Sequence, residues 1–266
     1  MSQFELWRLC RASLARYGVM NSCRLLIDDY LFDLKHGTRT AGTYSKSGIE
    51  KSNPNLKGTI VQYQGTPSRL FQCAMKDLDS SVLKGDFIDF GCGRGKVLLM
   101  AFDYSFKKLY GVELSEKLAK QTEQNLENYG AKKKKKASAN ICLGDARFFL
   151  IPPTASVFFF YNPFTWSIFE QVVENILESL RRHPREARLI YINDQHWKEL
   201  EKKKMQRVFR GSELRMNYSV WKPLVSLDEK DFRVVEKAIV MVSTKVIRLD
   251  LKRKALVFET LLYVPG

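Results

Sequence analysis

Three glycines at alternate positions follow a short apolar segment near the middle of the chain. The segment Asp86–Phe90 is followed by Gly91, Gly93 and Gly95. Because glycine has no Cβ, such a turn can adopt positive φ angles and bring its backbone close to a ligand. A helix that begins directly after the turn directs its free N–H groups towards the same space. The spacing therefore predicts a ligand site at the end of a strand.

The residues around these glycines discriminate between ligands. A dinucleotide-binding turn needs glycine or alanine at the sixth position of GxGxxG, and this chain has Lys96 there. A nicotinamide-dependent oxidoreductase is therefore disfavoured. The pattern is instead acidic-x-GxGxG, with Asp89 two residues before the first glycine. A carboxylate is poorly placed beside a pyrophosphate, but it suits a ligand with an ammonium group and no phosphate, such as the methionine end of S-adenosylmethionine.

Short apolar runs alternate with amphipathic stretches from Asp86 onward, and Ser115 is a candidate N-cap. Because helix-length stretches separate these strands, we expect parallel pairing through crossover connections. The predicted strands are Asp86–Phe90, Lys108–Glu113, Ala139–Leu143, Val157–Tyr161 and Leu189–Ile192, and the predicted helices are Lys96–Tyr104, Ser115–Tyr129, Trp166–Arg182 and His196–Phe209.

The two ends of the chain depart from this alternation. Phe232–Val242 and Ala255–Val264 are strand-like and are expected to finish the sheet as antiparallel strands. Phe4–Leu34 and Pro67–Leu83 look helical and flank the polar segment His36–Gln64. The expected division is an N-terminal helical cap or lid over residues 1–80 and one α/β domain over residues 81–266. That domain has a mostly parallel sheet with an antiparallel C-terminal hairpin and helices on both faces.

Four motifs stand in order at predicted strand ends: the glycine turn, the acid of Leu109–Glu113, Gly144-Asp145-Ala146 and Tyr161–Phe164. Over about Asp86 to Ile192 the chain resembles the class I S-adenosylmethionine-dependent methyltransferases, which have a Rossmann-like sheet. The resemblance implies that Glu113 binds both ribose hydroxyls and Asp145 the adenine amino group. It implies cofactor contacts for Asp89, Gly91, Cys92, Gly93, Gly95, Glu113, Leu114, Asp145, Ala146 and Asn162.

The fourth motif resembles the Asn-Pro-Pro-aromatic motif of methyltransferases that act on amino groups. Asn162, Pro163 and Phe164 are therefore the substrate-facing candidates, although this chain has one proline and its aromatic residue comes one position early. The acceptor stays open between a nitrogen and an oxygen nucleophile. A hydroxyl or a protonated amine needs a general base. The candidates are His196, just beyond the fifth strand, with Asp194 and His36 as alternatives.

The N-terminal polar segment resembles part of a group of bacterial methyltransferases of unassigned substrate. The resemblance covers Phe32-Asp33, His36-Gly37-Thr38 and Thr40, followed by Tyr63, the glycine turn Gly91–Gly95 and Asn162-Pro163-Phe164. It implies that this segment folds over the cofactor. The hydroxyls of Thr38, Thr40 and Tyr63 would then reach the methionine carboxylate or the acceptor.

Composition narrows the class of protein. The formal net charge of +15 favours contact with nucleic acid, anionic membrane surfaces or acidic proteins. Five of the positive charges, however, lie in Lys132–Lys136, a run typical of a solvated loop. The cysteines lack paired spacing and the histidines lack metal-ligand spacing, so free thiols, no metal site and a cytoplasmic location are expected. No apolar run approaches the length of a membrane span, which needs about 20 residues. The cysteines are Cys10, Cys23, Cys73, Cys92 and Cys142.

Two functions from different classes fit these observations. The first is a methyltransferase that uses S-adenosylmethionine and acts on an unidentified acceptor. The second is a basic nucleic-acid-binding protein on a catalytically inactive Rossmann-like scaffold. The net charge of +15 favours the second function. The intact acids Asp89, Glu113 and Asp145 disfavour it, because an inactive site has no chemical reason to keep them.

Overall fold

The computed structural model describes residues 3–44, 63–134, 137–224, 247–250 and 255–258. The chain divides into two compact units, Met1–Val225 and Ser226–Gly266. The first unit holds a seven-stranded sheet, and the described part of the second holds a two-stranded antiparallel sheet of β10 (Ile247–Asp250) and β11 (Ala255–Phe258). The predicted boundary between residues 80 and 81 is a different division and stays a prediction.

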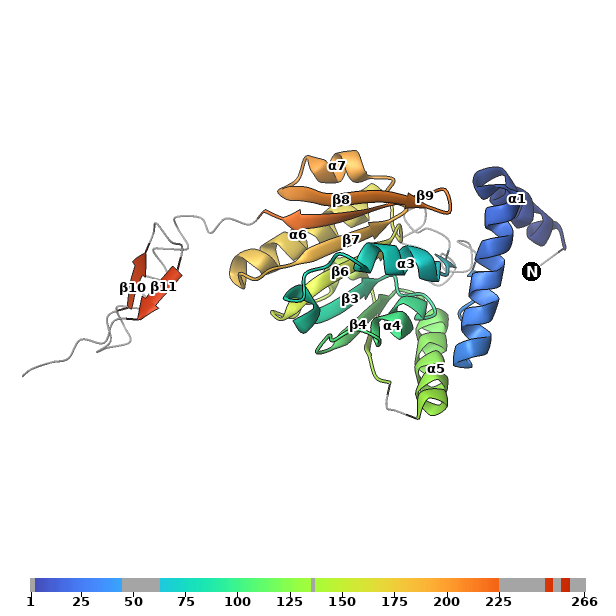
Figure 1. Cartoon of the computed structure of the whole chain (residues 1–266), viewed down its shortest axis with the longest axis horizontal. Helices are drawn as coiled ribbons and strands as arrows, with labels where there is room; N and C mark the ends of the chain where they lie inside the picture. Colours follow the sequence, from blue (N-terminus) through green and yellow to red (C-terminus); the bar gives the residue numbers. More distant parts are fainter. Residues whose placement is uncertain (1–2, 45–62, 135–136, 225–246, 251–254, 259–266) are drawn as a thin grey trace, which may run out of the picture. The chain divides into compact units, whose positions relative to one another are not determined.

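The seven-stranded sheet has the order β5-β4-β3-β6-β7-β9-β8 (Figure 1). The first five of these strands pair in parallel, and β9 pairs antiparallel with both β7 and β8. Strand order reverses between β3 and β6, which is where open α/β sheets bind ligands. The strands are β3 (Asp86–Phe90), β4 (Leu109–Glu113), β5 (Asn140–Leu143), β6 (Ala155–Tyr161), β7 (Arg188–Ile192), β8 (Met205–Glu213) and β9 (Met216–Pro223).

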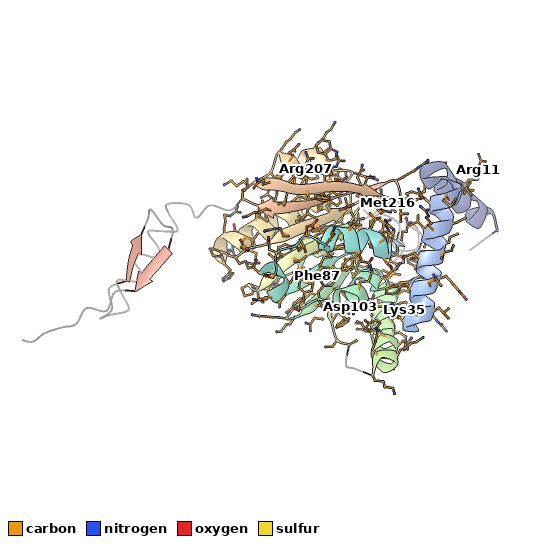
Figure 2. The ribbon with its side chains drawn as sticks, viewed as in Figure 1. Arg11, Lys35, Phe87, Asp103, Arg207 and Met216 are labelled. Carbon is orange, nitrogen blue, oxygen red and sulfur yellow. The ribbon has the colours of Figure 1, made fainter. Side chains whose placement is uncertain are left out.

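Helices cover both faces of this sheet, because alternate side chains of each central strand point to opposite sides. Phe87 and Phe159 pack on one face, with α1, α3, α4 and α5, and Figure 2 labels Phe87 inside this layer. Phe158 and Phe160 pack on the other face, with α6 and α7. The helices are α1 (Gln3–His36), α3 (Ser68–Met75), α4 (Lys96–Ala101), α5 (Glu116–Lys133), α6 (Trp166–Arg182) and α7 (Trp197–Glu201).

The predicted fold class is confirmed: a mostly parallel α/β sheet that an antiparallel hairpin closes. The residues of that hairpin were predicted wrongly, because β8 and β9 form it. The predicted strand Phe232–Val242 lies outside the described residues. Within the predicted strand Ala255–Val264, the described residues 255–258 form β11, which pairs antiparallel with β10.

The predicted helix His196–Phe209 was also wrong. Helix α7 ends at Glu201, and the chain then enters β8. Leu214 and Arg215 join β8 to β9 with φ angles of 54° and 59°, the left-handed geometry of a tight two-residue hairpin turn. Arg207 of β8 lies 4.9 Å above the Trp197 ring, so its guanidinium packs on an aromatic surface (labelled in Figure 2).

Short elements complete the N-terminal part of the first unit. Helix α1 is kinked at Gly18, which has a φ of 76°. After it, β1 (Thr43–Tyr44) pairs antiparallel with β2 (Tyr63–Gln64). Two 3₁₀ turns, Val82–Lys84 and Ala146–Phe148, precede β3 and follow β5. None of the described helices is long and apolar enough to cross a bilayer.

Candidate functional site

The glycine turn after β3 needs each of its glycines. Gly91, Gly93 and Gly95 have φ angles of 78°, 58° and 81°, in the left-handed region that side chains rarely adopt. A methyl group on Gly91 would lie 2.6 Å from the Cβ of Pro163, and one on Gly93 would lie 2.0 Å from the Tyr63 ring. The turn therefore packs closely between the end of β6 and the N-terminal segment, with no room for a side chain at Gly91 or Gly93.

Gly93→Ala is expected to weaken cofactor binding by at least about tenfold, because the new methyl group displaces either the turn or Tyr63. Calorimetric titration with S-adenosylhomocysteine measures the effect. Gly37→Ala is the matched control, since Gly37 also has a positive φ but lies outside the pocket lining, and its new methyl group would meet only the flexible side chain of Lys132. Full affinity in Gly93→Ala would contradict the prediction.

A pocket opens at the carboxyl ends of β3, β4 and β6, beside the start of α4. Its position agrees with the crevice that the strand order predicts. The predicted site residues that line it are Tyr63, Asp89, Gly91, Cys92, Glu113, Leu114, Asp145, Ala146, Pro163 and Phe164. The predicted residues that are not among its lining are Thr38, Gly93, Gly95, Asn162 and His196.

Asp89 is the most unusual group in this pocket. Its side chain lies at the end of β3 and the residue is only 3% exposed. Among the described residues, none donates a hydrogen bond to its carboxylate or forms an ion pair with it. Burial raises the pKa of Asp89 well above its usual range, and the nearby charge of Glu113 raises it further. A buried carboxylate of this kind is a ready partner for a cationic ligand group.

Glu113 ends the neighbouring strand β4 and is held by the backbone. Its two carboxylate oxygens accept hydrogen bonds from the N–H of Gly93 and of Ser115, each at 2.8 Å. Burial raises the pKa of Glu113 to about 7, although these backbone donors oppose the rise. Each carboxylate oxygen can accept a further hydrogen bond. Glu113 can therefore bind hydroxyl donors while it fixes the glycine turn.

Asp145 reaches the pocket but already has a partner. Its carboxylate forms an ion pair with Arg147 at 2.6 Å and also accepts the backbone N–H of Arg147. These contacts lower the pKa of Asp145 although its partial burial opposes them. Its oxygens have less capacity left for a ligand than those of Glu113. The role of Asp145 in binding an adenine amino group stays a prediction.

The fourth motif divides between the pocket and the core. Pro163 and Phe164 line the pocket, whereas Asn162 accepts a hydrogen bond from the hydroxyl of Tyr191 at 3.1 Å. Asn162 has a φ of 40°, so the chain turns sharply there. The side chain of Asn162 thus supports the turn that presents the next two residues.

The three candidate bases lie away from the pocket lining. His196 packs on the Trp166 ring at a centroid distance of 5.8 Å. The carboxylate of Asp194 accepts hydrogen bonds from Arg210 as part of an ion pair. His36 packs between Phe32 and Tyr129, where burial lowers its pKa. The structure therefore brings none of the three to the pocket lining.

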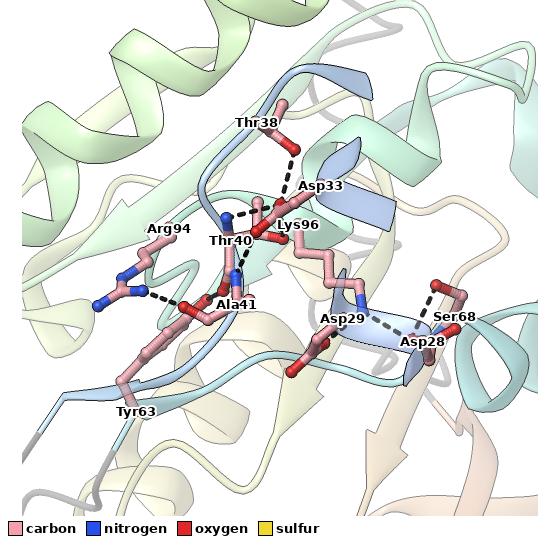
Figure 3. Close-up of polar contacts among 10 residues, drawn as sticks. All are labelled: Asp28, Asp29, Asp33, Thr38, Thr40, Ala41, Tyr63, Ser68, Arg94 and Lys96. Carbon is pink, nitrogen blue, oxygen red and sulfur yellow. Dashed lines mark hydrogen bonds and ion pairs between the residues drawn. The ribbon is translucent and has the colours of Figure 1, made fainter. Parts of the chain in front are cut away.

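The N-terminal segment lies against the glycine turn (Figure 3). The hydroxyls of Thr38 and Thr40 both donate to Asp33, each at 2.8 Å, and the hydroxyl of Tyr63 donates to the carbonyl of Thr40. These hydroxyls hold the segment together, and Tyr63 lines the pocket with its ring. That they bind the cofactor or the acceptor stays a prediction.

Two features of the pocket were missed from the sequence. Gln64, Gly65 and Thr66 continue the wall that Tyr63 begins, and Lys96 lines the pocket. Sequence reasoning used Lys96 only to exclude a dinucleotide. The sequence did contain a signal for this contact. Lys96 begins an otherwise apolar helix, and a lysine buried there requires acidic partners from another element. The described residues contain no group of three or more side chains placed to hold a metal ion.

No protein-family model and no curated protein sequence matches the chain. Several solved structures resemble it. An S-adenosylmethionine-dependent methyltransferase from Clostridium acetobutylicum has a TM-score of 0.47 and 10% identity, covering 66% of this chain and 97% of its own. An RNA methyltransferase from Salinibacter ruber, in complex with S-adenosyl-L-homocysteine, has a TM-score of 0.44 and 16% identity, covering 61% and 96%. An rRNA methylase from Streptococcus thermophilus has a TM-score of 0.44 and 14% identity, covering 58% and 94%.

These solved neighbours are methyltransferases, which is the kind of protein that the four sequence motifs resemble. The fold class itself rests on the strand order and on the antiparallel hairpin of this chain.

Proposed function

We propose that this chain is an S-adenosylmethionine-dependent methyltransferase. The observation that carries the proposal is the buried carboxylate of Asp89, which lines the pocket without a cationic partner among the described residues. A ligand ammonium group supplies the missing charge, and the pocket offers no phosphate-binding glycine–helix turn of the dinucleotide type. S-adenosylmethionine has such an ammonium group and lacks a phosphate.

The residues present fit this cofactor. Asp89 would hold the ammonium group of the methionine moiety, and Glu113 would accept the ribose hydroxyls. The apolar side chains of Leu114 and Ala146 line the same pocket, where they would contact the adenine ring. The glycine turn lets the backbone approach the ligand closely.

The chemistry is an in-line transfer, and S-adenosylmethionine supplies the activated methyl group when it is bound. The protein therefore acts mainly by holding the acceptor in a near-attack geometry. Phe164 and Pro163, which line the pocket at the end of β6, would shape the acceptor side. An acceptor that is a neutral amine or is already ionised needs no base from the protein. This requirement agrees with the positions of His36, Asp194 and His196 away from the pocket lining.

A calorimetric titration with S-adenosylmethionine, S-adenosylhomocysteine and NAD tests the proposal. We expect the two methionine-derived compounds to bind with one-to-one stoichiometry and NAD to show no heat of binding. Binding of NAD alone would support an oxidoreductase instead. Binding of none of the three would leave a scaffold without this cofactor and would overturn the proposal.

The net charge of +15 favours an anionic acceptor such as a nucleic acid. If a single-stranded nucleic acid binds through many phosphate contacts, its affinity should fall steeply as salt rises, by about 300-fold between 50 and 200 mM for six contacts. Fluorescence anisotropy with a labelled single-stranded RNA measures this slope. A flat salt response, or no binding, would assign the positive charge to solubility. Binding of RNA without any binding of S-adenosylhomocysteine would favour the inactive-scaffold alternative.

A further inference from the structure

The ammonium group of Lys96 connects the cofactor pocket to helix α1. Its Nζ lies 2.7 Å from Oδ2 of Asp28 and 2.7 Å from Oδ1 of Asp29. The side chain of Lys96 is only 2% exposed, whereas those of Asp28 and Asp29 are 27% and 19% exposed. Burying an ammonium group this deeply is costly unless hydrogen-bonded acidic partners offset the loss of water. Figure 3 shows the two aspartates of α1 converging on the lysine that begins α4.

Lys96 follows the glycine turn directly, so fixing it also fixes one end of the turn. The neighbouring residue Arg94 donates from its guanidinium to the carbonyl of Ala41. Asn125 of α5 bridges the same two segments, because its amide accepts from the N–H of Arg39 at 2.8 Å and donates to the carbonyl of Arg94 at 2.9 Å. The turn is thus tied to the N-terminal segment through both the guanidinium and the carbonyl of Arg94.

Asp33 fixes the N-terminal segment itself. Its carboxylate accepts hydrogen bonds from the hydroxyls of Thr38 and Thr40 and from the N–H groups of Thr40 and Ala41, at 2.8 to 2.9 Å. These four donors lower the pKa of Asp33, although partial burial opposes the shift. The segment that contacts the glycine turn is therefore rigidly built on the end of α1.

Asp28 also holds the chain beside the wall of the pocket. Its carboxylate also accepts the N–H and hydroxyl of Ser68, at 3.0 and 3.1 Å. Ser68 begins α3 directly after the wall residues Tyr63–Thr66 and Pro67. One carboxylate of α1 therefore connects the start of α3 with the start of α4, on two sides of the pocket.

We propose that Asp28 and Asp29 are positioning residues for the cofactor site. Through Lys96 they hold the glycine turn in its binding geometry, and Asp28 holds the adjoining wall through Ser68. Neither aspartate lines the pocket, so α1 contributes to binding without contacting the ligand. The inference rests on the proposed function for its ligand, but the effect on the turn is independent of any ligand.

Asp29→Asn and Lys96→Met test the proposal, because each breaks one side of the cluster. Two readouts are needed: affinity for S-adenosylhomocysteine by calorimetry, and backbone hydrogen exchange of residues 91–99 in the ligand-free protein. We expect each variant to bind at least about tenfold more weakly and to exchange faster at residues 91–99. The double variant should be much less impaired than the product of the two single effects, since both remove the same interaction.

Two further variants separate positioning from a general loss of stability. Asp29→Glu keeps the charge and should recover part of the affinity. Asp79→Asn is the matched control, because it breaks a different ion pair, with the buried Arg188 at the start of β7. Asp79 lies outside the pocket lining, so this variant should leave the affinity within about twofold of the unaltered protein.

The outcomes are distinct. Faster exchange confined to residues 91–99 and 63–66 supports the proposal, whereas equal acceleration in β6 and α6 shows a merely structural cluster and overturns it. Wild-type affinity in both Asp29→Asn and Lys96→Met also overturns it. If the unaltered protein fails to bind S-adenosylhomocysteine, the proposed function fails, and the exchange measurement still decides whether α1 positions the turn.

Discussion

Asp89→Asn is expected to weaken binding of S-adenosylmethionine by about ten- to a hundredfold and, at the same time, to stabilise the free protein. The loss of affinity follows from removing a charged hydrogen-bond partner of the ligand ammonium group, an interaction of about 1.5–3 kcal/mol. The gain in stability follows from burial. The carboxylate lies in a site where no described residue offsets its charge, and asparagine has nearly the same shape without that charge.

The gain in stability expected for Asp89→Asn depends on pH. The pKa of Asp89 is raised in the folded protein, mainly by burial. Its contribution to stability is therefore fully present below its ordinary pKa of 3.8 and is lost as the pH rises through the folded-state value. At neutral pH Asp89→Asn should unfold at a higher temperature than the unaltered protein, and the difference should shrink in acid.

Asp86→Asn is the matched control for Asp89→Asn. Asp86 is also buried in β3, but it lies at the opposite end of the strand, where Thr154 donates a hydrogen bond to its carboxylate. This variant should not gain stability, since its carboxylate has a partner, and it should keep its affinity for the cofactor. Calorimetry and thermal unfolding measure both quantities. Unchanged affinity in Asp89→Asn would show that Asp89 does not bind the ligand ammonium group, and the proposed function would lose its main support.

The central strands could be predicted from the sequence because their apolar runs are bounded by turn residues. The predicted strand Asp86–Phe90 is confirmed residue for residue, and Trp166–Arg182 is confirmed as a helix. The latter has apolar residues at helical spacing on one side, which is the pattern of a helix that covers a sheet. These elements carry their own signal, so no distant contact was needed to assign them.

The edge of the sheet could not be predicted in the same way. Among the described strands, β8 pairs only with β9, and it mixes charged with apolar residues, so its pattern is weak. Its turn uses Leu214 and Arg215 at positive φ instead of glycine or asparagine, and the sequence therefore lacks the usual hairpin signal. The predicted strand Ala255–Val264 carries a stronger local pattern, but that pattern does not encode its pairing with β10.

Some residues of the candidate site could be predicted from the sequence, and others could not. Residues at strand ends, such as Asp89 and Glu113, could be placed from the motif, because the carboxyl ends of parallel strands meet at one edge. The contacts of Lys96 with Asp28 and Asp29 could not, since they join residues 67 and 68 positions apart in the chain. Such ion pairs depend on how α1 packs, which local spacing does not encode.

Affinity for S-adenosylhomocysteine is expected to rise with pH and to level off above about pH 7, because Glu113 must be ionised to accept two ribose hydroxyls. Burial raises the pKa of Glu113 from its ordinary value of 4.5 to about 7. A ligand that binds the ionised form lowers this pKa, so affinity should fall by up to about tenfold for each pH unit below 7. Asp89 contributes to the same slope, because burial, together with the nearby charge of Glu113, raises its pKa as well.

Glu113→Gln isolates the part of this slope that belongs to Glu113. Glutamine cannot titrate, and its NH₂ group would face an N–H donor where the carboxylate now accepts from Gly93 and Ser115. The variant should bind about tenfold more weakly at pH 8, and its affinity should vary less between pH 6 and 8. Glu116→Gln, at an exposed glutamate that pairs with Lys120, should keep the wild-type profile. A Glu113→Gln profile as steep as that of the unaltered protein would show that another group controls binding, and the ribose assignment would then be wrong.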